Sequence, residues 1–168
     1  MPTNLNEKGK AAELALNKWL NDNGLSFLYI NQDRETFATL FQKGVKRPDF
    51  LILLESVGLI GVDVKHYGRN KNKYTLKLEH ELKRVLAFER IFRISVWYAY
   101  YAEENGKTCW YWISALKAVE VGEVFTNSKT KEQFVAVDLS NFERIENNFD
   151  LGKLYTHRLP GLRKIKNF

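Results

Sequence analysis

The sequence predicts an α/β domain in which a central mixed β-sheet is flanked by helices. Two short apolar runs, residues 50–54 and 59–64, are separated by Ser56-Val57-Gly58, which is typical of a buried hairpin. Apolar residues recur at helical spacing both before and after that hairpin. Aromatic-rich segments with strand character follow the second helical stretch. Helices and strands therefore alternate, as in a sheet covered by helices.

The first half of the chain begins with an amphipathic helix over residues 6–23, followed by a short strand over residues 26–30. Asn23-Gly24 provides the stop signal for that helix. Its apolar stripe consists of Ala12, Leu16, Trp19 and Leu20. After the hairpin and a basic loop, a second helix is expected over about residues 75–92. Its stripe consists of Leu78, Leu82, Val85, Leu86 and Phe92.

Two aromatic strands are expected over residues 95–102 and 108–113, joined by a turn at Asn105-Gly106. A short helix near residues 115–118 and a strand at residues 133–139 follow. We interpret residues 1–168 as one domain, with a core over about 7–113 and a basic tail over about 153–168.

Composition excludes several classes of protein. The single cysteine, Cys109, cannot form an intramolecular disulfide or a thiolate zinc site. No signal peptide or membrane-spanning segment is recognisable, so we expect a soluble, intracellular (cytoplasmic) protein without a membrane partner. With 26 Lys and Arg against 20 Asp and Glu, the net charge is +6, which favours anionic partners without choosing among them.

The chemically informative segment surrounds the hairpin. Pro48-Asp49 precedes the first strand, and Asp63-Val64-Lys65 ends the second. Residues paired in a hairpin have numbers with a constant sum, and a turn centred near Ser56 pairs Asp49 with Asp63 to within two residues. Lys65 lies two residues beyond Asp63, so it projects from the same face. Two carboxylates and one ammonium group should converge at one sheet edge.

Two carboxylates held side by side repel each other unless a cation binds between them. Hard oxygen ligands suit Mg²⁺, and Mn²⁺ can replace it. Such an ion stabilises charge on a phosphodiester and lowers the pKa of a bound water, while a nearby lysine orients that water or neutralises developing charge. The pattern therefore predicts phosphodiester hydrolysis.

At these residues the chain resembles the PD-(D/E)xK nuclease superfamily, the restriction endonuclease-like fold shared with archaeal-type Holliday junction resolvases. Pro48-Asp49 matches the PD element, and Asp63-Val64-Lys65 matches the (D/E)xK element. The stretch from Gly9 to Glu13 resembles the G-x-x-x-E of the resolvase-like members. Asp63 stands where glutamate is common, and residues after about 113 match nothing in the family.

The resemblance implies that Asp49 and Asp63 bind the divalent ion, with Glu13 supporting it or a second ion and the backbone carbonyl of Val64 as a further ligand. It also implies that Lys65 positions the attacking water. DNA is the expected substrate, and a homodimer would place two sites on two strands. Basic residues flanking the motifs are candidate nucleic-acid contacts. They are Lys43, Lys46, Arg47, Arg69, Lys71 and Lys73.

Other interpretations stay open from the residues alone. The two acids could be solvated strand ends, and the aromatic strands could stack bases instead of forming core. A second motif copy, Glu81-Leu82-Lys83, is set aside because it falls inside the expected second helix, where positions two apart do not face each other. The alternatives to a DNA endonuclease are an RNA-cleaving toxin on the same fold and a non-catalytic nucleic-acid-binding subunit.

Overall fold

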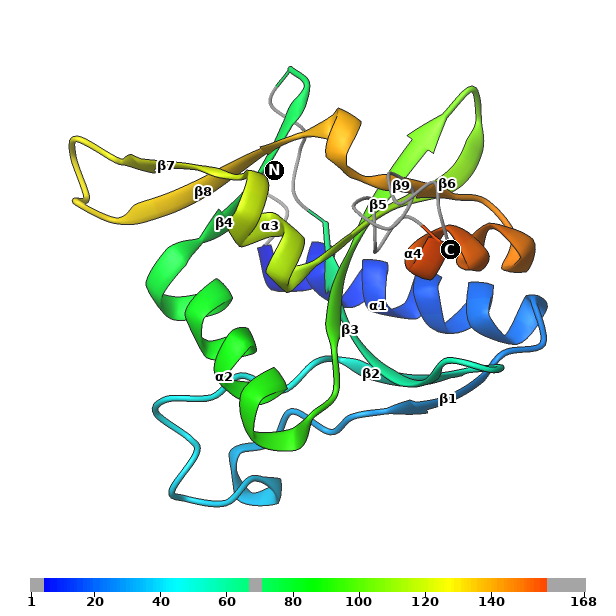
Figure 1. Ribbon diagram of the computed structural model, residues 1–168, viewed down its shortest axis with the longest axis horizontal. Coiled ribbons are helices and arrows are strands. Elements are labelled where there is room, and N and C mark those ends of the chain that lie inside the picture. Colours follow the sequence, from blue (N-terminus) through cyan, green and yellow to red (C-terminus); the bar gives the residue numbers. More distant parts are fainter. Residues whose placement is uncertain (1–4, 67–70, 157–168) are drawn as a thin grey trace, which may run out of the picture.

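The fold is a central mixed β-sheet with helices on both faces, as the sequence predicts (Figure 1). The computed structural model describes residues 5–66 and 71–156. The six-stranded sheet has the order β1-β2-β3-β5-β6-β9, and only β3 and β5 run parallel. Its strands are β1 (Ser26–Tyr29), β2 (Phe50–Leu54), β3 (Gly58–Lys65), β5 (Val96–Glu104), β6 (Lys107–Ser114) and β9 (Glu143–Ile145).

A second, three-stranded antiparallel sheet has the order β4-β8-β7. Its strands are β4 (Lys73–Lys77), β8 (Gln133–Asp138) and β7 (Glu123–Thr126). The helices are α1 (Leu5–Asp22), α2 (Lys83–Phe92), α3 (Ala115–Val121) and α4 (Lys153–Thr156), with a π-helical turn (Leu78–Leu82) immediately before α2. Strands from beyond residue 113 thus enter both sheets, so the folded core extends past the segment expected to contain it.

The expected helix over residues 75–92 is wrong at its start. The chain is extended through β4 and becomes helical only at Leu78. Polar and apolar residues alternate in the segment KYTLK, so Tyr74 and Leu76 point into the core and are buried. Pairing with β8, about 60 residues further along the chain, satisfies the backbone groups along one edge of β4.

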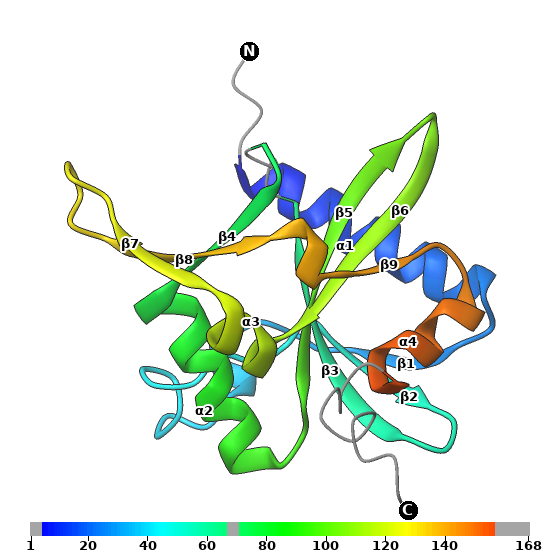
Figure 2. The same cartoon turned by 45° about the horizontal axis from the view of Figure 1, so that its top comes forward.

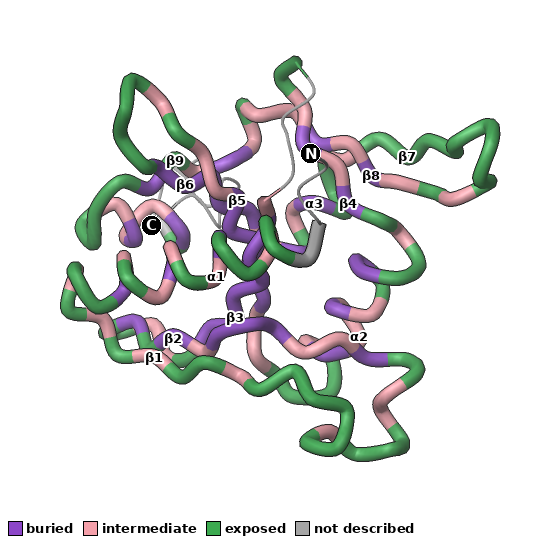
Figure 3. Tube along the Cα trace, turned by 180° about the vertical axis from the view of Figure 1, so that it is seen from behind, coloured by how far each residue is buried: buried purple, intermediate pink, exposed green. Residues whose placement is uncertain are grey.

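Side chains alternate across β3 and β5, and this alternation builds two separate cores. Figure 3 shows that buried residues concentrate along these central strands. On one face, α1 buries Leu16 and Leu20 completely against residues such as Val62. Each such burial contributes about 1.5–3 kcal/mol relative to exposure. On the other face, α2 and α3 pack with the second sheet on residues that include Tyr98. Figure 2 shows α1 and α2 on opposite sides of the central strands.

The aromatic strands form core, as the favoured interpretation expected. Buried aromatic side chains of β5 and β6 are Trp97, Tyr98, Tyr100, Trp110, Tyr111 and Trp112. Cys109 is also buried. Among the described residues, no helix is both long and apolar enough to cross a membrane.

Candidate active site

Asp49 and Asp63 face each other where β2 and β3 come together. The β2–β3 register pairs Phe50 with Val62, whose residue numbers have the same sum as those of the predicted pair Asp49 and Asp63. Asp49 lies one residue before β2, and its N–H donates to the carbonyl of Val62 at 2.9 Å. Only 8% of Asp49 and 1% of Asp63 is exposed. Two buried carboxyl groups therefore share one end of the hairpin.

The two carboxyl groups have opposite protonation behaviour. Burial and the neighbouring charge of Asp63 raise the pKa of Asp49 well above its usual range. Burial alone would also raise the pKa of Asp63, but Lys46 and Lys65 outweigh burial and hold it well below its usual range. Asp49 Oδ2 accepts the N–H of Val64 at 2.7 Å. The pair thus consists of one firmly ionised acid and one that resists ionisation.

Two lysines and two acids, one of them Asp63, form a closed ring of alternating charges beside Asp49. Lys46 Nζ lies 2.5 Å from Asp63 Oδ2 and 3.0 Å from Glu81 Oε1. Lys65 Nζ lies 3.1 Å from Asp63 Oδ1 and also pairs with Glu81 Oε1. Each lysine therefore contacts both acids, and each acid contacts both lysines. We call Lys46, Asp63, Lys65 and Glu81 the ion ring.

Different elements deliver the members of the ion ring. Asp63 and Lys65 are two residues apart in β3, so their side chains lie on the same face of the sheet, opposite α1. Glu81 comes from the π-helical turn before α2, a type of turn often found at functional sites. Lys46 comes from the loop before β2, where its backbone N–H donates to the carbonyl of Arg84 in α2 at 3.1 Å.

Tyr98 lies beside the ring on the neighbouring strand. The parallel β3–β5 register pairs it with Asp63, and Lys65 Nζ lies 5.6 Å from the centre of its ring. Its hydroxyl is buried and has no hydrogen-bond partner in the part of the chain that the structure describes. Burial, with further contributions from Asp63 and Glu81, raises the pKa of Tyr98 well above its usual range. A neutral aromatic side chain, that of Tyr98, thus lies against the ion ring.

Buried ion pairs of this kind add little to the free energy of unfolding. Removing ions from water costs several kcal/mol each, and replacing a buried ion pair by apolar residues is often neutral or stabilising. Clusters of groups with strongly shifted pKa values concentrate at functional sites. Asp49 and the ion ring are therefore the candidate functional site.

The carboxylate oxygens of Asp49 and Asp63 are hard donors of the kind that could hold a divalent cation. With all groups ionised, three carboxylates face two ammonium groups, and one net negative charge remains. A cation bound beside Asp49 would favour the ionised form of this carboxyl group, whose pKa is raised by burial and by the charge of Asp63. Among residues 5–66 and 71–156, no group of three or more His, Cys, Asp or Glu side chains is placed to hold a metal ion. Further ligands would come from water, backbone or substrate, as Mg²⁺ commonly accepts.

Glu13 is not brought into this cluster. Its carboxylate Oε2 accepts a hydrogen bond from the hydroxyl of Tyr29 at 2.6 Å. Tyr29 packs edge-on against Phe50, which belongs to the core on the α1 side of the sheet. The hydrogen bond to Glu13, with burial and the charge of Asp49 as further causes, raises the pKa of Tyr29 to about 12. The metal-supporting role of Glu13 remains a prediction, as does the role of the Val64 carbonyl.

The predicted nucleic-acid contacts lie in several different environments. Lys46 is part of the ion ring. The guanidinium of Arg47 donates to Thr36 Oγ1 at 2.7 Å and stacks on Phe37, so it holds the loop before β2. Lys73 pairs with Glu123 at 2.8 Å across the second sheet. Lys43 is exposed, Lys71 has a positive φ of 56°, and Arg69 lies outside the described residues.

Glu81 is the site residue that sequence reasoning missed. Its motif copy falls within the expected helix, and Lys83 does pair with Glu79 on the surface instead of entering the site. Glu81 itself is only 8% exposed and reaches both lysines of the ring. The available signal was an acidic residue beside Leu82 on the apolar side of the expected helix.

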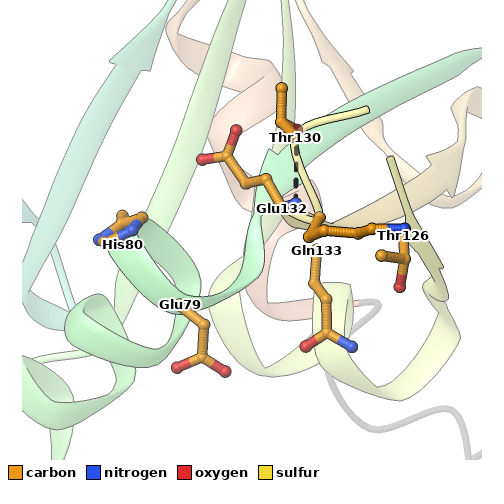
Figure 4. A pocket seen from close by; sticks show the side chains of 7 residues that line it. Glu79, His80, Thr126, Thr130, Glu132 and Gln133 are labelled. Atoms are coloured by element: carbon orange, nitrogen blue, oxygen red, sulfur yellow. Dashed lines mark hydrogen bonds between the residues drawn. The ribbon is translucent and has the colours of Figure 1, made fainter. Parts of the chain in front are cut away.

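A separate pocket of about 480 Å³ lies between the π-helical turn and the β7–β8 hairpin (Figure 4). The side chains of Glu79, His80 and Thr130 are among those that line it. Its lining includes no member of the ion ring, and Glu132 N–H donates to Thr130 Oγ1 at 3.3 Å within it. We therefore place the candidate site at the ion ring and not in this pocket.

Comparison of the chain with protein-family models, with curated proteins and with solved structures finds no match in any of the three.

Proposed function

We propose that this protein is a Mg²⁺-dependent endonuclease that hydrolyses phosphodiester bonds of DNA, built on a PD-(D/E)xK-type site. The observation that carries the proposal is the buried, facing pair Asp49 and Asp63, with Lys65 paired to Asp63 at 3.1 Å. These three residues are the charged members of the two motif elements that resemble the PD and (D/E)xK elements. A buried carboxyl pair that lacks one positive charge is suited to a divalent cation.

Asp49 and Asp63 would hold the ion, which supplies charge stabilisation to a phosphodiester and lowers the pKa of a bound water. Lys65 is fixed between Asp63 and Glu81, so its ammonium group is preorganised. A fixed positive charge stabilises negative charge that develops on the phosphate in the transition state, without reorganisation cost. Lys65 would thus orient the attacking water or neutralise that charge.

The test is cleavage of a substrate panel with Mg²⁺ or Mn²⁺. The panel contains supercoiled plasmid, linear duplex, a four-way junction, single-stranded DNA and tRNA. The matched variant is Asp49→Asn, because an amide oxygen can still accept the Val64 N–H and preserve the local backbone. We expect cleavage of a DNA member by the wild type and loss of at least a hundredfold in the variant, about 2.7 kcal/mol of transition-state stabilisation.

Cleavage that is equal in both proteins would contradict the assignment of Asp49. Cleavage of tRNA alone would move the substrate class to RNA. Tight binding without cleavage of any member would favour the non-catalytic binding subunit. A homodimer would place one site on each strand of a duplex, and sedimentation of the wild-type protein tests this prediction.

A further inference from the structure

Lys46 is the member of the ion ring with the most access to solvent. Its side chain is 30% exposed, whereas those of Asp63 and Lys65 are 2% and 6% exposed. Glu81 is also largely covered, with 11% of its side chain exposed. A molecule approaching from solvent would therefore meet Lys46 before the other three members.

The backbone of Lys46 is fixed although its side chain reaches solvent. Its N–H is bound to the Arg84 carbonyl, and its neighbour Val45 is buried in the core beside α2. Pro48, two residues further on, is also buried. A lysine has four rotatable side-chain bonds, so the ammonium group can leave the ring while the chain around it stays in place.

Both carboxylate oxygens of Asp63 already contact an ammonium group. Lys46 contacts Oδ2 and Lys65 contacts Oδ1. A divalent cation bound to Asp63 would be repelled by both lysines at short range. One of them must withdraw before a cation can bind closely. Lys65 is enclosed by the fold, so Lys46 is the lysine able to withdraw.

We propose that Lys46 is an exchangeable counter-ion, whose ammonium group neutralises Asp63 in the metal-free protein and leaves when a divalent cation binds. The released side chain, still anchored at the rim of the site, then contacts a phosphate of the substrate. This inference rests on the proposed function and specifies how its site is regulated. The exchange breaks two ion pairs and involves no covalent step.

Lysine acylation of the wild-type protein, read by mass spectrometry with and without Mn²⁺, tests the exchange directly. An ammonium group held in two ion pairs reacts slowly, because acylation requires the free amine. We expect the acylation rate of Lys46 to rise at least fivefold when Mn²⁺ binds. Lys83, which is ion-paired to Glu79 on the surface, is the internal control and should not change. In Asp49→Asn, which weakens cation binding, the rise should disappear.

Calorimetric titration with Mn²⁺ supplies a second, independent measurement. Lys46→Met removes the competing charge, so Mn²⁺ should bind at least tenfold more tightly than to the wild type. Lys83→Met removes a lysine outside the ring and should leave the affinity within about twofold. Thermal unfolding of both variants establishes that they are folded, and the acylation experiment needs no variant at all.

The outcomes separate this inference from the proposed function. If the wild type binds no Mn²⁺ up to about 20 mM, well above the millimolar range of weak carboxylate sites, both proposals fail. If Mn²⁺ binds at Asp49 but the acylation rate of Lys46 and the affinity of Lys46→Met do not change, only the counter-ion role fails. A weaker affinity in Lys46→Met would also overturn it.

Discussion

Asp49 and Asp63 face each other across the β2–β3 hairpin with pKa values shifted in opposite directions. The difference follows from their partners. Asp63 contacts two ammonium groups, whereas Asp49 accepts the backbone N–H of Val64 and lies beside the charge of Asp63. The same kind of side chain should therefore stabilise the protein at one position and destabilise it at the other.

We expect Asp49→Asn to raise the free energy of unfolding at pH 7 and Asp63→Asn to lower it. The first variant removes a buried carboxyl group whose ionisation is unfavourable. The second leaves Lys46 and Lys65 with only one shared acid, and breaking a buried ion pair costs about 3–5 kcal/mol. Urea unfolding of the three proteins in metal-free buffer measures both effects, and two changes of the same sign would contradict the assignment.

The pH dependence of these two effects should also differ in sign. The raised pKa of Asp49 means that its contribution to stability is fully present below the unfolded value of about 3.9 and is lost as pH rises through the folded value. The lowered pKa of Asp63 means that its contribution is present above about pH 3.9 and is lost on acidification. The advantage of Asp49→Asn over the wild type should thus grow with pH, as urea titrations from pH 4 upward would show.

Glu81→Gln should reduce Mg²⁺-dependent cleavage by about 10–100-fold, the usual effect of removing a group that orients a site residue. Glu81 holds both lysines of the ion ring, so its loss leaves Lys65 paired with Asp63 alone. The matched control is Glu79→Gln, two residues away on the same turn, where the side chain pairs with Lys83 on the surface. Equal cleavage rates in the two variants would exclude a role for Glu81 in the site.

The hairpin and its register could be predicted because they depend on local information. Two apolar runs and a short turn fix which residues face each other, so Asp49 and Asp63 could be paired from their numbers alone. The beginning of the second helix could not be located in this way. Residues 73–77 form a strand because β8 lies beside them in the fold, and that partner is remote in sequence.

The same distinction explains what was predicted of the site. Lys65 follows Asp63 along one strand, so strand periodicity brings them together. Glu81 and Lys46 join them through the packing of α2 and of the loop before β2 against the sheet. No spacing in the sequence encodes that packing. In the sequence, Lys46 therefore resembles one of several surface cations. Glu81 stands out only as an acid on the apolar side of the expected helix, which does not reveal the groups that it contacts.

Gly61→Ala should destabilise the protein by about 1–3 kcal/mol and reduce cleavage. A Cβ at this position in β3 would lie 2.9 Å from Cγ of Pro48 and 3.1 Å from Cγ2 of Val96. Pro48 immediately precedes Asp49, so relief of the clash would displace the carboxyl group from its partner. Gly44→Ala is the control, because a Cβ added there would meet nothing within 4 Å, and it should change stability and cleavage far less.

Glu13→Gln should lower the pKa of Tyr29 from about 12 towards the ordinary value of about 10. Glu13 Oε2 accepts a hydrogen bond from the Tyr29 hydroxyl, with 2.6 Å between the two oxygens, and the carboxylate repels a phenolate. Neutralising the carboxylate therefore removes the largest cause of the pKa shift. Because the folded pKa is raised, the contribution of Tyr29 to stability is complete below about pH 10 and is lost as pH rises towards 12. The variant should lose less stability over that range than the wild type does. Carbon-13 labelling of the tyrosine rings follows the ionisation by NMR, with Tyr29→Phe identifying the signal. A pKa of Tyr29 that stays near 12 in Glu13→Gln would show that burial or the charge of Asp49 causes the shift instead.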